Sequence, residues 1–207
     1  RRRCLCIEMD FDKDGYINSY KFHRGIIKSV ARLTYTEVEN QLINGVKDSD
    51  YAESLKAAIV LFNKLIINKG YRGALDFTIS EPFLQTNSNG DIKHIADRKR
   101  LNSHKLIEEF MLAANISAAD FISQYAKEGV YRIHEHPESL KIQRLSQVLK
   151  NRGINWNGSI EDIENISEFI LKLNKRDDAP ILNMLILQSM QRAEYSTLNK
   201  GHFGLKF

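Results

Sequence analysis

Three polar residues with the spacing of one helix face lie in the most apolar helical stretch of the chain: His104, Glu108 and Asn115. Separations of four and seven residues return to the same side of an α-helix, and most neighbouring residues here are apolar. We therefore predict a helix over residues 103–126 that is buried nearly all round. Because a buried carboxylate is costly without a partner, Glu108 is expected to face a partner or a ligand.

Tyr35 is a second candidate for ligand contact, because it lies three residues after Arg32 in the stretch RLTYTEV. An aromatic ring beside a cation is the combination that stacks a base or contacts a ribose. A tyrosine near the start of a helix is also typical of ordinary packing. The residues alone leave both interpretations open.

One motif has the oxygen spacing of a calcium loop. Asp10, Asp12 and Asp14, followed by Gly15, match the first half of an EF-hand. The twelfth position, where a bidentate carboxylate should close the site, is Lys21, and the flanking residues favour strands over helices. We predict a solvent-exposed hairpin turn here, and a small calcium-binding protein remains the less favoured alternative.

A second motif with metal-binding side chains is His134-Glu135-His136. Adjacent residues of an extended segment point to alternate sides, so only the two histidines could converge. We predict no metal site within the chain.

The elements that position these residues follow an α+β order, with strands clustered early and helices late. Asp-Gly between two β-prone runs predicts an N-terminal β-hairpin, and the apolar stripe of the second helix is expected to end at Gly70. Mixed strands around the buried long helix and a helical C-terminal half complete the prediction. The expected strands are 4–11, 16–22, 74–77, 83–86, 92–95 and 131–134, and the expected helices are 36–43, 51–69, 103–126, 137–151, 163–173 and 181–190.

Composition describes an ordinary soluble protein of 207 residues, 43% hydrophobic, with a formal net charge of +4. The length allows one sizeable domain or two small ones, and the charge permits a polyanionic partner without requiring one. No apolar run approaches the ~20 residues that span a bilayer. Cys4 and Cys6 are expected on opposite faces of a strand, which argues against a mutual disulfide. We expect a cytoplasmic, monomeric protein with no membrane association.

Several segments, in the same order, resemble the catalytic (RNB) domain of the ribonuclease II and ribonuclease R family, and they look closer to the R type. The segments are ARLTYTEV (31–38), RGALDF (72–77), NSHKLIEEFMLAAN (102–115), YRIHEHP (131–137), QSMQRAEY (188–195) and GHFGL (201–205). The resemblance implies a processive 3′-to-5′ exoribonuclease that hydrolyses single-stranded RNA with Mg²⁺ and releases nucleoside 5′-monophosphates.

The resemblance also assigns roles to three residues that would contact RNA. Tyr35 matches a tyrosine near the 3′-terminal nucleotides, and Glu108 matches a glutamate that favours ribose over deoxyribose. A 2′-hydroxyl can donate to Glu108 and accept from the Tyr35 hydroxyl, which DNA cannot do. Phe77 matches a phenylalanine on which terminal bases stack, although an aromatic core residue on a strand is the alternative.

Two parts of the family pattern are missing. The family holds its metal with an Asp-x-Asp-Asp cluster, whereas the only adjacent aspartates here, Asp177 and Asp178, follow two basic residues. An arginine motif that follows GHFGL in the family is also absent. The chain opens at Arg1 without a methionine, so we interpret residues 1–207 as a partial domain with no catalytic residue of its own. The alternative is a non-enzymatic RNA-binding module on the same fold.

Overall fold

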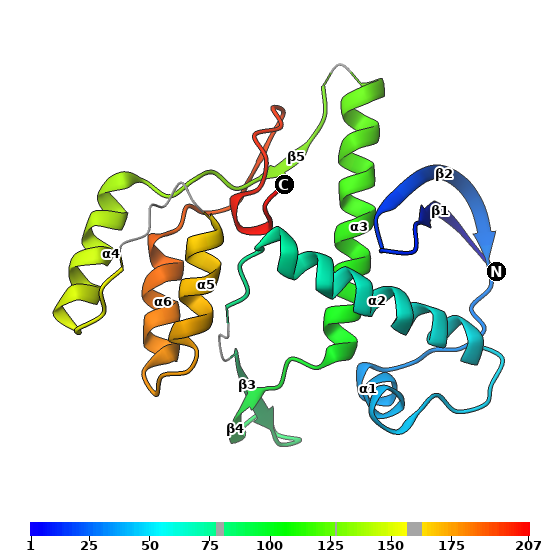
Figure 1. Ribbon diagram of the computed structural model, residues 1–207. Coiled ribbons are helices and arrows are strands. Elements are labelled where there is room, and N and C mark those ends of the chain that lie inside the picture. The colour runs from blue at the N-terminus through cyan, green and yellow to red at the C-terminus, as the bar shows by residue number, and fades with distance from the viewer. Residues whose placement is uncertain (78–80, 127, 157–162) are drawn as a thin grey trace. The chain divides into compact units, whose positions relative to one another are not determined.

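The computed structural model describes residues 1–77, 81–126, 128–156 and 163–207 (Figure 1). The chain divides into two compact units. Unit 1 comprises residues 1–71 and 100–127, and unit 2 comprises residues 72–99 and 128–207. Within the described residues, the strands form three separate two-stranded antiparallel ribbons. The predicted α+β class is confirmed, but these strands do not assemble into a sheet around one helix.

Unit 1 opens with the predicted hairpin, formed by β1 (Arg2–Phe11) and β2 (Ile17–Ile27). The Asp12 carboxylate closes the turn, because its Oδ1 accepts from the backbone N–H groups of Asp14 and Tyr16 at 2.8 Å each. Gly15 supplies the positive φ of 86° that this turn requires. The aspartate-rich motif therefore lies in a hairpin turn between two strands.

Cys4 and Cys6 share one face of β1, so the prediction that they lie on opposite faces is wrong. Side chains two residues apart in a strand point to the same side. The two Sγ atoms are 3.2 Å apart, and neither thiol belongs to a disulfide. Their hydrogen bond raises the pKa of the Cys4 thiol.

Three helices complete unit 1: α1 (Tyr35–Asn44), α2 (Ala52–Arg72) and α3 (Asn102–Tyr125). The prediction that the second helix ends at Gly70 is wrong, because α2 continues through this glycine. A glycine is tolerated in a helix at a modest cost, whereas a left-handed backbone ends one. Gly73, with φ of 71°, is the residue that has this conformation.

The long helix α3 is confirmed, but it is buried on one side only. Its fully buried residues recur at helical spacing and are Ser103, Leu106, Glu109, Ala113 and Ser117. Ile107 and Met111, in contrast, are 48% and 54% exposed. The expectation of burial nearly all round is therefore wrong, since the apolar residues cover more of the helix than the rest of the structure packs against.

Unit 1 is held together by contacts between the hairpin and the second half of α3. The Tyr20 hydroxyl donates to the Asp120 carboxylate, which raises the pKa of Tyr20 to about 12. Beside this bond the rings of Phe22 and Phe121 lie 4.9 Å apart. The polar and aromatic contacts together fix the hairpin against the helix.

Unit 2 contains two short ribbons and a group of three helices. The apolar core lies among the helices and includes Leu149, Leu182 and Ile186, each at most 2% exposed. Figure 1 shows the three helices beside one another. The elements are β3 (Glu81–Thr86), β4 (Ile92–Arg98), β5 (Tyr131–Ile133), β6 (Glu194–Ser196), α4 (Ser139–Asn151), α5 (Ile163–Leu173) and α6 (Ala179–Ser189).

Two predictions for unit 2 need correction. Residues 74–77 form no strand, although the Leu75 N–H donates to the Gly204 carbonyl at 2.9 Å. The segment therefore runs beside the C-terminal loop without a regular ladder. Pro180 lies just before the predicted helix 181–190, but the structure places it in the first turn of α6, where a backbone N–H would have no intrahelical acceptor.

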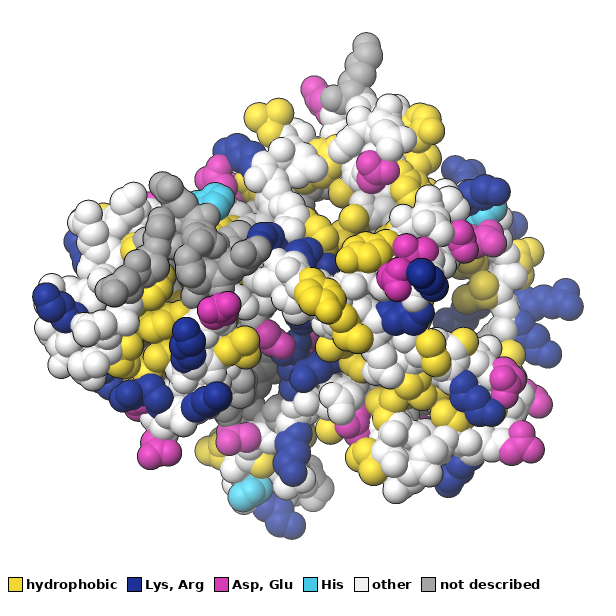
Figure 2. Space-filling model, viewed as in Figure 1, with side chains coloured by type: hydrophobic (Ala, Val, Ile, Leu, Met, Phe, Trp, Pro, Cys, Tyr) yellow, Lys and Arg dark blue, Asp and Glu magenta, His cyan; other side chains and the backbone are white. Residues whose placement is uncertain are grey.

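The surface of the described residues carries mixed charges and many large apolar side chains. On the face drawn in Figure 2, Lys and Arg side chains alternate with Asp and Glu, and hydrophobic groups lie between them. Leu5, Tyr71 and Tyr125 are each more than 70% exposed. Among the described residues, every helix is too short or too polar to act as a membrane span.

Candidate nucleic-acid interface

Tyr35 is the first residue of α1, and a capping box sets its position. The Thr34 side chain accepts from the Glu37 N–H, and the Glu37 carboxylate accepts from the Thr34 N–H at 2.7 Å. The hydrogen bond from the Thr34 N–H to the carboxylate lowers the pKa of Glu37. The Tyr35 ring stacks on His104 of α3, with ring centroids 4.1 Å apart and 24° between the planes. Tyr35 is still 46% exposed, so part of this residue remains accessible to a ligand.

The start of α3 is bound to α1 through one carboxylate. Glu39 accepts from the backbone N–H of Ser103 at 2.8 Å and from the Asn102 amide at 3.3 Å. A carboxylate at a helix N-terminus satisfies free N–H groups and complements the helix dipole. In the same turn His104 Nδ1 accepts from the Leu101 N–H at 3.1 Å. His104 is thus oriented by a backbone bond and presents its face to Tyr35.

Glu108 lies one helical turn after His104 and is partly exposed, so the prediction that it is buried is wrong, whereas the prediction that it faces a partner is confirmed. Arg100 Nε lies 3.3 Å from Glu108 Oε1, and an Arg100 terminal nitrogen donates to Oε2. The two side chains are 40% and 39% exposed. A carboxylate has about four lone-pair positions, so a bidentate guanidinium leaves acceptor capacity facing solvent.

Of the two adjacent glutamates, Glu108 and Glu109, the buried one is Glu109. Its side chain is 4% exposed, and Oε1 lies 3.0 Å from Nζ of Lys69 on α2, which is 14% exposed. Its ion-pair partner therefore comes from another helix of unit 1. Such burial is typical of a structural carboxylate and leaves little of Glu109 exposed to a ligand.

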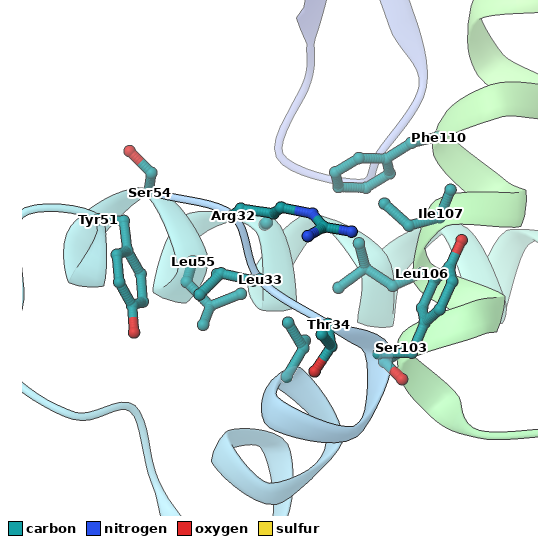
Figure 3. Close-up of a pocket in the computed structure, with 13 residues that line it drawn as sticks. Arg32, Leu33, Thr34, Tyr51, Ser54, Leu55, Ser103, Leu106, Ile107 and Phe110 are labelled. Carbon is teal, nitrogen blue, oxygen red and sulfur yellow. The ribbon is translucent and has the colours of Figure 1, made fainter. Parts of the chain in front are cut away.

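A pocket of about 700 Å³ adjoins Tyr35. It is lined mainly by apolar side chains, with the Ser103 hydroxyl and the Arg32 guanidinium among the polar groups. Figure 3 shows Arg32 extending across the pocket toward Ile107 and Phe110 of α3. The Ser103 hydroxyl oxygen is buried and has no hydrogen-bond partner among the described residues. A largely apolar hollow with a cation and a few hydroxyls suits a flat, polar-edged ligand such as a nucleobase.

Phe77 belongs to unit 2, whereas Tyr35 and Glu108 belong to unit 1. Phe77 lies at the end of an irregular segment, not on the predicted strand. It is half-buried and packs against the apolar core of the unit 2 helices. This packing favours the core interpretation of its ring, and a stacking role for it remains a prediction.

Three histidines of unit 2 lie close to one another or to the same phenylalanine ring. The rings of His134 and His202 are 5.0 Å apart, and His136 contacts the Phe203 ring at 4.7 Å. Burial lowers the pKa values of His134 and His202. Across the described residues, no three His, Cys, Asp or Glu side chains come together to hold an ion. The donors present therefore do not fit the Mg²⁺ that the sequence resemblance implies.

Two contacts around the candidate site were not predicted from the sequence. Arg100 pairs with Glu108 across eight residues that include the irregular start of α3, so helical spacing could not indicate the contact. The Tyr35–His104 stack joins residues 69 positions apart. His104 did belong to the predicted polar stripe. Its position four residues before Glu108 was the one sequence signal that it lies near the candidate site.

Comparison with known proteins decides the family. The RNB domain model matches residues 1–207 of this chain. The chain belongs to the RNB domain family. Ribonuclease R of Escherichia coli (strain K12) is 34% identical over 210 residues, a match that covers 99% of this chain and 26% of that protein. The RNB chain thus spans about a quarter of the length of such curated relatives.

Solved structures agree on the fold. Mycoplasma genitalium RNase R in complex with ribose methylated single-stranded RNA superposes with a TM-score of 0.92 at 23% identity, covering 99% of this chain and 33% of that chain. Yeast Ssd1, a pseudonuclease, superposes with a TM-score of 0.67 at 15% identity, covering 98% and 25%. At these identities the structures establish a shared fold only.

Proposed function

We propose that this RNB chain is part of a 3′-to-5′ exoribonuclease of the ribonuclease R type that hydrolyses single-stranded RNA to nucleoside 5′-monophosphates. The observation that carries the proposal is the match of the family model along all 207 residues, together with 34% identity to a ribonuclease R. The complex of a structural neighbour with single-stranded RNA supports the choice of substrate.

In this proposal, unit 1 recognises the sugar of a nucleotide near the 3′ end. A ribose 2′-hydroxyl would donate to the free lone pairs of Glu108 and accept from the Tyr35 hydroxyl. Arg100 would hold the Glu108 carboxylate in position, while the face of Tyr35 stays fixed on His104. Phe77 would add sequence-independent stacking on a terminal base.

Magnesium dependence belongs to the same proposal. The described residues lack a donor set for the ion, so its ligands would come from other residues. Bound Mg²⁺ would supply a metal-activated nucleophile for phosphodiester hydrolysis. We expect the 207-residue chain alone to leave RNA intact, and the full-length protein to shorten it with Mg²⁺ and to stop in EDTA.

The test of ribose recognition uses the full-length protein and two oligonucleotides that differ only in the sugar at their 3′ ends. A hydrogen bond to a charged group contributes roughly 1.5–3 kcal/mol, which corresponds to about 10- to 100-fold in rate. Glu108→Gln should reduce the preference for ribose over deoxyribose by that factor. Glu53→Gln, an 89% exposed carboxylate on α2, is the matched control and should change nothing. An unchanged preference in Glu108→Gln would refute this role.

The second candidate is a non-enzymatic RNA-binding module. It is favoured by the superposition on a pseudonuclease, since the fold alone does not guarantee catalysis. A 5′-labelled single-stranded RNA distinguishes the two. Full-length protein that retards the RNA in a gel but never shortens it, with Mg²⁺ present, would support the binding module and reject the exoribonuclease.

A further inference from the structure

The thiols of Cys4 and Cys6 form an unassigned pair on one face of the N-terminal hairpin. Their Sγ atoms are 3.2 Å apart, and both residues are half-buried, so solutes can reach them. Neither residue belongs to the interface around Tyr35 and Glu108. They are the only two cysteines in the chain.

The opposite strand leaves the space over both sulfurs open. Cys4 pairs with Gly25 and Cys6 pairs with His23 across the ribbon. A Cβ added at Gly25 would lie 3.8 Å from Cys4 Sγ and 3.9 Å from Cys6 Sγ. A residue with a larger side chain at this position would extend over the thiols. The glycine thus keeps one small opening that both sulfurs share.

Strand geometry suits a bridging atom better than a direct sulfur–sulfur bond. Residues two apart in a strand have Cα atoms roughly 6.6–6.8 Å apart, at the upper limit for a disulfide, and their Cβ bonds are parallel. A metal ion at about 2.3 Å from each sulfur spans up to roughly 4.6 Å between them. Parallel side chains reach such an ion with a small rotation, without movement of the backbone.

The number and type of donors select the ion. No third His, Cys, Asp or Glu completes a cluster around the thiols in the described part of the chain. His23, the nearest candidate across the ribbon, directs its Nε2 to Glu8 at 3.1 Å. Zinc requires four ligands, whereas monovalent copper is soft and is satisfied by two thiolates.

We propose that Cys4 and Cys6 bind one Cu(I) ion as a two-thiolate site on the hairpin. Each thiol releases its proton to solvent as its sulfur bonds to the ion, so one Cu⁺ replaces two protons and the copper stays monovalent. Binding would tie two positions of β1 together and restrain the hairpin that contacts α3. The site is independent of RNA hydrolysis.

The experiment is competition for Cu(I) between the full-length protein and the chelator bathocuproine disulfonate, under reducing and oxygen-free conditions. Relative to the unsubstituted protein, Cys4→Ser and Cys6→Ser should each lose one equivalent of bound copper. Leu5→Ser, on the opposite face and 73% exposed, is the matched control and should retain it. Circular dichroism of each variant checks that the hairpin substitutions leave the fold intact.

A geometric test separates this site from copper bound elsewhere. Gly25→Ala should keep the copper, because its Cβ meets the sulfurs at ordinary contact distance. Gly25→Val should lose it, because the added methyl groups occupy the opening. Copper retained in full by the Cys4→Ser/Cys6→Ser double variant would overturn the proposal. Retention of Zn²⁺ in preference to Cu(I), or a disulfide forming where copper should bind, would overturn it equally.

Discussion

Replacing Glu109 with leucine should destabilise unit 1 far more than the same change at its neighbour Glu108. Glu109 and Lys69 are 4% and 14% exposed, with 3.0 Å between Oε1 and Nζ. Removing one member of a buried ion pair costs about 3–5 kcal/mol, because the other charge stays in a poorly solvated place. In a chain of this size each kcal/mol lowers Tm by about 2–4 °C, so Glu109→Leu should lower it by roughly 6–20 °C.

The paired substitution decides whether the ion pair is the cause. Lys69→Met/Glu109→Leu replaces both charges by apolar side chains of similar volume, and such replacements are often neutral or stabilising. We expect the double variant to regain most of the lost stability, with a coupling free energy of about 2 kcal/mol or more, within the range known for contacting residues. The assay is thermal unfolding followed by circular dichroism.

Glu108→Leu is the control for helix propensity and surface charge. Its pair with Arg100 is about 40% exposed, and exposed ion pairs contribute about 0–1 kcal/mol. Its Tm should therefore fall by no more than about 4 °C. Equal losses at the two positions, or additive losses in the double variant, would refute the assignment of Glu109 as the buried partner of Lys69.

Three further predictions concern the helices and the histidines. Gly70→Ala should stabilise the protein by about 0.5–1 kcal/mol, because Gly70 lies within α2 and an added Cβ would meet open space. Gly73→Ala should instead destabilise it by about 1–2 kcal/mol, because φ is 71° at this residue. Chemical denaturation compares the two variants. Leu182→Ala, at a fully buried position, should cost about 2–5 kcal/mol in the same assay. Burial lowers the pKa values of His134 and His202, so the unfolded chain binds more protons and stability should fall as pH drops through about 6.5. Thermal unfolding at several pH values should show a smaller fall when both are glutamine.

Local patterns predicted the elements well and their burial less well. The Asp-Gly turn predicted the hairpin, because Asp12 and Gly15 supply the carboxylate and the positive φ that such a turn needs. The predicted helix end at Gly70 was wrong, because a glycine ends a helix where its φ is positive. Gly73, and not Gly70, has a positive φ. Residues 74–77 failed as a strand because alternation of apolar residues does not say whether a partner strand exists.

Side-chain partners distant in the sequence could not be predicted from spacing. The polar stripe on α3 could not say which of two adjacent glutamates is buried, since that depends on where Lys69 of α2 lies. Glu108 carries the motif match and faces solvent, held by Arg100 from outside the helix. The resemblance implies a role for Glu108, and the contacts place its carboxylate at the surface in a pair with Arg100, whereas Glu109 is buried against Lys69. A ligand-binding carboxylate needs acceptor atoms that a ligand can reach, whereas a buried structural carboxylate needs a charged partner inside the fold.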